Sequence, residues 1–178
     1  MTKWILVDTE SGARQGAGFG QSPYTGVMTE FGAVELVSKL SFHGVLWPSQ
    51  PSAENPAIPE ILPGAQPYDS VKVMTEFAKW LDSLRADRLV FVSDNNGWDY
   101  MWISYEFDRA GIPNPFGHSS RRIGDFWAGL ETNWRDSSLW KRYRVTAHTH
   151  HPVDDALGNA EALEHLLRAS GLWEMVTE

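Results

Sequence analysis

Residues 4–11 have the sequence Trp-Ile-Leu-Val-Asp-Thr-Glu-Ser, in which four apolar residues are followed closely by two acids. The unbroken apolar run predicts a buried strand at 3–7. Asp8 and Glu10 stand two residues apart, and because side chains alternate along a strand, both carboxylates are expected on one face. Acids after a strand are also typical of a solvated loop, so the pair becomes informative only together with the rest of the chain.

The rest of the sequence predicts further strands from apolar runs and helices from apolar residues at helical spacing. Short apolar runs predict further strands at 31–37, 39–42 and 89–92. Helical spacing, capping residues and glycine or proline stops predict helices at 70–86, 98–110, 123–130 and 152–170. Six prolines between residues 44 and 69 indicate a long irregular connection, typical of a binding loop or mobile flap. The pattern predicts one α/β domain over residues 1–178, with a mixed sheet and helices on its faces.

Composition narrows the class of protein. A chain of 178 residues with 42% hydrophobic residues can bury a sizeable core, and no apolar run approaches membrane-spanning length. The first residues lack a signal-peptide pattern and the chain has no cysteine, so we expect a cytoplasmic protein with no membrane partner. A net charge of −8 argues against a general nucleic-acid coat, although a nuclease whose carboxylates are neutralised by metals remains compatible with it.

A third acid, Asp99, falls in the first turn of the predicted helix 98–110, just after the predicted strand 89–92. Its simplest role is a favourable charge at a helix N-terminus, which contributes under about 1 kcal/mol. Asn95 lies four residues earlier and could order the turn, and Asp94 is a rival to Asp99 as a ligand.

The segment His-Thr-His-His-Pro-Val-Asp-Asp at 148–155 combines three histidines with Asp154 and Asp155. Both acids open the last predicted helix, so helix-dipole stabilisation is again the simplest role. The string is loosely similar to the HxHxDH zinc motif of metallo-β-lactamase-like hydrolases, which requires further distant ligands. Only His165 remains downstream to supply such a ligand, which disfavours a zinc hydrolase. A zinc hydrolase is therefore kept only as an alternative.

Asp8, Glu10, Asp99 and Asp155 thus lie near the ends of four predicted elements. Gathering carboxylates without counter-charge raises the free energy, so a cluster implies divalent cations. Hard oxygen ligands favour Mg²⁺ or Mn²⁺. His150, five residues before Asp155, adds a proton acceptor near neutral pH. Together these are the components of a two-metal phosphodiesterase.

The order and context of these motifs resemble the DEDDh branch of the DnaQ-like 3′-5′ exonucleases, within the RNase H-like superfamily. The matching motifs are DTES at 8–11, NNGWD at 95–99 and HHPVDDA at 150–156. The strand sequence EFGAVEL at 30–36 is similar to the strand that follows the first motif in that family. The chain lacks the Thr-Gly that often follows the first motif, and its second motif is more polar. Both departures concern substrate preference rather than chemistry.

The resemblance implies an RNase H-like fold, a mixed five-stranded sheet flanked by helices. Its first three strands would be antiparallel, with the strand that carries Asp8 in the centre. The implied catalytic residues are Asp8, Glu10, Asp99, His150 and Asp155. The four carboxylates would hold two Mg²⁺ or Mn²⁺ ions, with Asp8 between them, and His150 would accept the proton of the attacking water. Implied substrate contacts are Thr9, Ser11, Asn95 and Trp98.

The implied partner is single-stranded DNA or RNA with a free 3′ end, from which the enzyme would release nucleoside 5′-monophosphates. A homodimer is compatible with the resemblance. The alternatives are an oligoribonuclease, an RNase T-like RNA-trimming enzyme, or a catalytically idle binding module for nucleic acid or protein on the same fold. Aromatic residues that could stack on bases are Trp98, Trp102, Phe19 and Tyr24, and the basic segment 121–144 could hold phosphates or form a solvated face.

Overall fold

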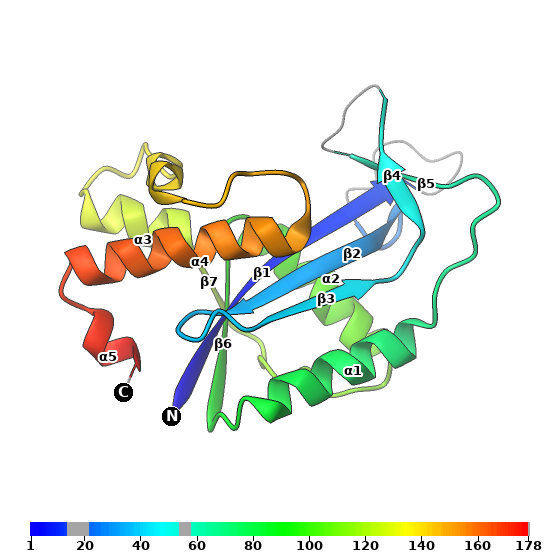
Figure 1. The fold of residues 1–178 in the computed structure, drawn as a ribbon, viewed down its shortest axis with the longest axis horizontal. Helices are drawn as coiled ribbons and strands as arrows, with labels where there is room; N and C mark the ends of the chain where they lie inside the picture. Colours follow the sequence, from blue (N-terminus) through cyan, green and yellow to red (C-terminus); the bar gives the residue numbers. More distant parts are fainter. Residues whose placement is uncertain (14–21, 54–57, 178) are drawn as a thin grey trace.

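The structure is a computed structural model that describes residues 1–13, 22–53 and 58–177. Its centre is a five-stranded sheet around β1 (Thr2–Ala13). On one side β1 pairs antiparallel with β2 (Gly26–Glu35), which pairs antiparallel with β3 (Ser41–Val45). On the other side it pairs parallel with β6 (Arg88–Ser93), which pairs parallel with β7 (Ser120–Arg122). The predicted mixed sheet is confirmed, with its first three strands antiparallel and β1 central (Figure 1).

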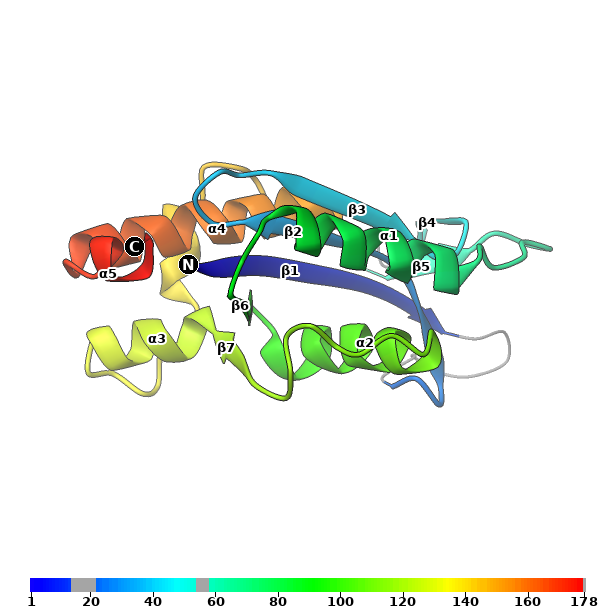
Figure 2. The ribbon, with the colours of Figure 1, turned by 90° about the horizontal axis from the view of Figure 1, so that it is seen from below.

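The helices form a layer on each face of this sheet. They are α1 (Ser70–Ser83), α2 (Asn96–Arg109), α3 (Ile123–Leu130), the 3₁₀ helix η1 (Leu139–Tyr143), α4 (Pro152–Ala169) and α5 (Trp173–Thr177). Side chains of β1 alternate between the two cores: Ile5 and Val7 pack with α1 and α2, whereas Leu6 packs with α3 and α4. Figure 2 shows α2 and α4 on opposite sides of β1. By the same period of two, Asp8 and Glu10 lie on the face of β1 that α4 covers.

Local signals account for most helix ends. Asp69 caps α1 as predicted, since its carboxylate accepts a hydrogen bond from the Lys72 amide at 3.2 Å. Pro152 is the first residue of α4, where its missing amide hydrogen costs no hydrogen bond of the helix. Gly171, with φ of +72°, ends that helix.

Two parts of the sheet differ from the sequence prediction. β7 was missed because it has three residues, two of them arginine, and therefore no apolar run. The connection 44–69 is not wholly irregular, since β4 (Ser49–Pro51) and β5 (Pro59–Ile61) pair as a small antiparallel hairpin. β5 crosses closely over β1, where a Cβ on Gly12 would lie 2.6 Å from the Pro59 carbonyl oxygen. Within the described residues, no helix is long and apolar enough to cross a membrane.

Gly32 allows the start of α4 to lie directly on β2. A Cβ at this position would be 2.3 Å from the carbonyl carbon and oxygen of Pro152 and 2.4 Å from the Val153 nitrogen. Gly32 is also the register partner of Asp8 across the β1–β2 pair. The missing side chain therefore sets how closely the N-terminus of α4 approaches the strand that carries Asp8.

Gly32→Ala is expected to destabilise the protein. The atoms that would clash belong to the α4 backbone, so the helix must move, and overpacking of this kind lowers the free energy of unfolding by about 1–3 kcal/mol. Urea unfolding measures the change. Gly129→Ala is the matched control, because Gly129 lies in α3 with nothing within 4 Å of a new Cβ, and alanine stabilises a helix interior by about 0.5–1 kcal/mol. Equal stability of Gly32→Ala and wild type would contradict the close approach.

Candidate active site

The structure brings the predicted acids of β1 together with the acid of α4. The ligand oxygens of Asp8, Glu10 and Asp155 all lie within 4.8 Å of one another. Glu10 stands opposite Glu30 in the β1–β2 register, and the register shifts immediately after Glu10. Glu30 in turn is 2.7 Å from His43 Nε2, a contact that offsets part of the repulsion between the two glutamates.

Asp99 is presented from the first turn of α2 and held by Thr9. The Thr9 amide donates to Asp99 Oδ1 at 3.1 Å and the Thr9 hydroxyl donates to the same oxygen at 2.9 Å. Asp99 is buried, and its other oxygen, Oδ2, accepts no hydrogen bond within the described residues. A buried carboxylate oxygen without a donor is a free acceptor for a cation. Asp94, the rival to Asp99, is instead 2.5 Å from Lys141 Nζ.

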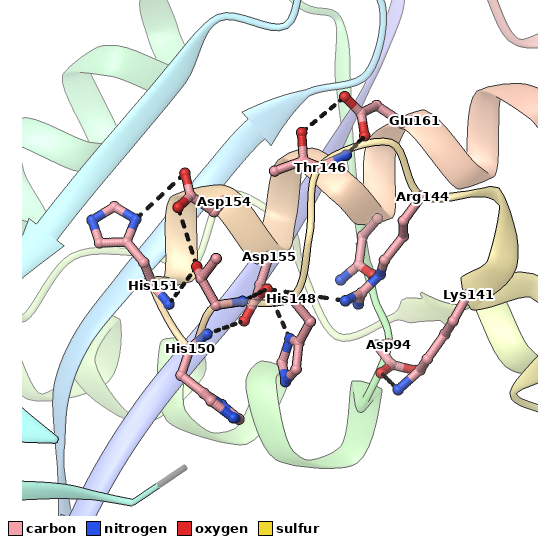
Figure 3. A network of polar contacts seen from close by, with 12 residues as sticks. Asp94, Lys141, Arg144, Thr146, His148, His150, His151, Asp154, Asp155 and Glu161 are labelled. Atoms are coloured by element: carbon pink, nitrogen blue, oxygen red, sulfur yellow. Dashed lines mark hydrogen bonds and ion pairs between the residues drawn. The ribbon is translucent and has the colours of Figure 1, made fainter. Parts of the chain in front are cut away.

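Asp155 is fully buried, and the loop before α4 wraps around its carboxylate (Figure 3). The Thr149 amide donates to Oδ1 and the His150 amide donates to Oδ2, each at 3.1 Å. His148 Nδ1 lies 2.8 Å from Oδ1. The carboxylate is therefore fixed in position before any ligand binds.

The electrostatics of the cluster favour uptake of positive charge. Burial, reinforced by Asp99, Glu10 and Asp155, raises the pKa of Asp8 well above its ordinary value. Burial and the neighbouring Asp155, Glu30 and Asp99 raise the pKa of Glu10 to about 8. Burial also raises the pKa of Asp99 to about 7, against the opposing contacts of its carboxylate with Thr9 and Ser93. Carboxylates with raised pKa values hold protons that a divalent cation can replace, so this all-oxygen donor set fits Mg²⁺ or Mn²⁺.

Arg144 is a largely buried cation beside the cluster, and the sequence motifs did not assign it to the site. Its side chain is only 9% exposed, its Nη1 lies 4.0 Å from Asp155 Oδ1, and its Nη2 donates to Asn159 Oδ1. The guanidinium also lies over the ring of Trp140, 5.4 Å from the centroid. Gly158 leaves room for it, because a Cβ there would lie 3.3 Å from the Arg144 side chain. Arg144 lowers the pKa of Asp8 and partly neutralises the site without metal.

The three histidines of the 148–151 segment have different surroundings. His150 has φ of +61°, a strained conformation for a residue other than glycine, and its ring lies 4.3 Å from that of His148. His151 extends to the other side of the loop, where it packs edge-on against His43 at 4.9 Å (Figure 3). His150 also lines a pocket together with Glu10 and Glu30. The structure thus places His150, and not His151, beside the carboxylates.

The other wall of this pocket comes from the proline-rich connection. Ser49, Gln50, Pro51 and Pro59 of the β4–β5 hairpin complete its lining. The hairpin is positioned by its close crossing over β1 at Gly12. The segment that the sequence marked as a binding loop therefore lies beside Glu10 and His150.

The predicted substrate contacts occupy varied positions. The hydroxyl of Thr9 is engaged with Asp99, and Ser11 is buried with no hydrogen-bond partner for its hydroxyl among the described residues. Asn95 is exposed just before α2, and Trp98 is half-buried with its ring edge-on to Trp102 at 5.9 Å. Their contact with a substrate stays a prediction.

Of the proposed stacking aromatics, Trp102 is fully buried in the core and Tyr24 is 92% exposed. Phe19 lies outside the described residues. The basic segment 121–144 is not one free cationic face, since Arg122 pairs with Asp125 at 3.1 Å, Lys141 pairs with Asp94, and Arg144 is buried.

Comparison with known proteins supports the fold. No protein-family model and no curated protein sequence matches the chain. A solved structure described as the nuclease domain of 3′hExo, a DEDDh family member bound to rAMP, matches with a TM-score of 0.67. The match has 11% sequence identity and covers 96% of this chain and 94% of that chain. The chain therefore has the RNase H-like fold of a DEDDh nuclease domain, as the motifs implied.

Proposed function

We propose that this protein is a metal-dependent 3′-5′ exonuclease, formed by one domain over residues 1–178. It shortens single-stranded DNA or RNA from a free 3′ end and releases nucleoside 5′-monophosphates. The observation that carries the proposal is the convergence of Asp8, Glu10 and Asp155, with His150 beside Glu10. Asp99 is close enough to raise the pKa of Asp8, and one of its oxygens has no hydrogen-bond donor among the described residues. The solved nuclease domain with the same fold was bound to rAMP, which supports a nucleotide ligand. The absence of cysteine fits a place in the reducing cytoplasm.

The residues divide the work as follows. Asp8, Glu10 and Asp155 would hold one divalent cation, and Asp99 with Asp8 would hold the second. When bound, such ions lower the pKa of water and neutralise charge on the leaving 3′ oxygen. His150 accepts the proton of the attacking water, and the loop amides and Thr9 hold the carboxylates in place. Arg144 offsets part of the repulsion among the carboxylates when no ion is bound.

The direction of cleavage is tested with a 5′-labelled oligonucleotide on a denaturing gel, using matched DNA and RNA strands. We expect a ladder that shortens one nucleotide at a time, slower cleavage of a strand that ends in a 3′-phosphate, and no cleavage of a closed circle. Internal cuts or cleaved circles would identify an endonuclease. Shortening only of very short RNA would favour an oligoribonuclease, and binding without any cleavage would favour an idle module.

Metal dependence is expected to be complete. EDTA should abolish cleavage, and Mg²⁺ or Mn²⁺ should restore it, because the carboxylates are the proposed source of catalytic ions. Ca²⁺ should bind yet support little turnover, since its loose geometry positions water poorly. Initial rates in metal-free buffer supplemented with each ion measure this effect. Full activity in the presence of excess EDTA would contradict the proposal.

A further inference from the structure

A second group of metal ligands adjoins the carboxylate cluster and shares one residue with it. Ligand atoms of His148, His150 and Asp155 all lie within 4.8 Å of one another. Figure 3 shows both histidine rings extending to the same side of the loop, next to the Asp155 carboxylate. We propose that these three residues form a site for a transition-metal ion such as Zn²⁺, and that occupation of this site takes Asp155 away from the magnesium cluster.

The donor atoms of the two groups favour different ions. The cluster of Asp8, Glu10 and Asp155 offers oxygen alone, which suits Mg²⁺ and Mn²⁺. His148 and His150 add two imidazole nitrogens, and nitrogen ligands bind Zn²⁺, Cu²⁺ and Ni²⁺ far better than they bind Mg²⁺. Two histidines and one carboxylate with an open fourth position form a familiar donor set for zinc.

The geometry needs little adjustment to accept zinc. Two ligand atoms about 2.1 Å from zinc at the tetrahedral angle lie about 3.4 Å apart. His148 Nδ1 is 2.8 Å from Asp155 Oδ1, so this pair must open by about half an ångström. The side chain of His148 is 52% exposed and free to turn, whereas Asp155 is fixed by two loop amides. The strained backbone of His150 holds its ring against that of His148 at 4.3 Å before any ion arrives.

Sharing Asp155 makes the two kinds of ion antagonists. An ion held by His148 and His150 engages a carboxylate that the magnesium cluster needs, so each ion lowers the affinity for the other by the same factor. It also occupies His150. Zinc is therefore an inhibitor of the exonuclease, and this consequence rests on the proposed function. The antagonism between the two ions in binding is independent of that function.

Binding is tested with untagged protein and Zn²⁺, by competition with a chromophoric chelator. His148→Ala removes a ligand that belongs only to the histidine group and should weaken zinc binding by more than about 10-fold, since loss of a residue that merely supports a metal ligand already costs about that much. Glu10→Gln removes a ligand that belongs only to the carboxylate group, and His151→Ala changes an adjacent histidine that belongs to neither group. These two control variants should bind zinc like wild type. Equal zinc affinity in wild type and His148→Ala would overturn the site.

Antagonism is tested by the electron paramagnetic resonance signal of free Mn²⁺, which needs no activity. Zinc should release bound Mn²⁺ from wild type at about one equivalent, and His148→Ala should require more than about 10-fold more zinc. Zinc that binds without releasing Mn²⁺ would overturn the sharing of Asp155. For wild type and for His148→Ala, the nuclease rate relative to the zinc-free rate of the same protein should fall over the zinc concentrations that release Mn²⁺. If zinc and Mn²⁺ compete as expected but no variant cleaves any strand, the site stands and the proposed function fails.

Discussion

Asp8→Ala and Asp155→Ala are each expected to abolish strand cleavage while the protein stays folded. Loss of a carboxylate that positions catalytic ions removes several kcal/mol of transition-state stabilisation, which corresponds to a rate reduced about 10³-fold or more. Single-turnover rates with Mg²⁺ measure the effect. Asp154→Asn is the control for Asp155, because Asp154 is its half-buried neighbour in the same helical turn and its carboxylate contacts Thr149 and His151 rather than the cluster. A wild-type rate in either alanine variant would rule out the assignment of the site.

The same two variants should differ in stability. Asp8 is repelled by three other carboxylates, so its removal should raise the melting temperature of the metal-free protein. Asp155 accepts bonds from two loop amides and faces Arg144, so its removal leaves buried donors unpaired and should lower the melting temperature. The gain from Asp8→Ala should be larger at pH 8 than at pH 5. The pKa of Glu10 is raised from 4.5 to about 8 and that of Asp99 from 3.8 to about 7. Between these values the folded protein holds protons that the unfolded chain has released, so the metal-free protein loses stability as the pH rises through this window.

His150→Ala is expected to lower turnover by roughly 10²- to 10⁴-fold, the usual loss for a missing general base, with little change in KM. Alanine keeps a Cβ at φ of +61°, so the substitution removes the imidazole without adding the backbone freedom of glycine. Steady-state rates across pH measure the effect. His151→Ala is the control, because its ring packs against His43 on the other side of the loop. His148→Ala should also be milder. If His151→Ala loses activity and His150→Ala keeps it, the motif has been aligned to the wrong histidine.

Much of the fold was predictable because its signals are local. The apolar run at 4–7 defined β1, and the period of two placed Asp8 and Glu10 together on the face that α4 covers. Asp69 and Pro152 marked the starts of two helices correctly. β7 was not predictable, since its three residues form a strand only because β6 offers a free edge.

The acids of the site could be predicted from their chemistry, but the residues that position them could not. Gly32 acts through a contact with α4, far along the chain, and Arg144 acts through the folded positions of Asp155 and Asn159. Nothing local distinguishes these two residues from an ordinary strand glycine or a surface cation. The sequence assigned Thr9 to the substrate from its place in a motif, and that contact stays a prediction, but it did not indicate that the Thr9 hydroxyl holds Asp99. The sequence therefore predicts which residues supply the donor atoms of the site, and the fold determines how those atoms are arranged.

The docking of α4 on Gly32 has a consequence for the timing of activity during synthesis. Asp8, Glu10 and Asp99 leave the ribosome well before His150 and Asp155, and the sheet and α2 can assemble before the last long helix exists. A nascent chain then carries three of the four acids and no complete site. The proposed cleavage of nucleic acid, including the message being translated, would have to wait until α4 is made and packed against β2. On the proposed function, the order of residues along the chain would protect the cell from a partly made nuclease.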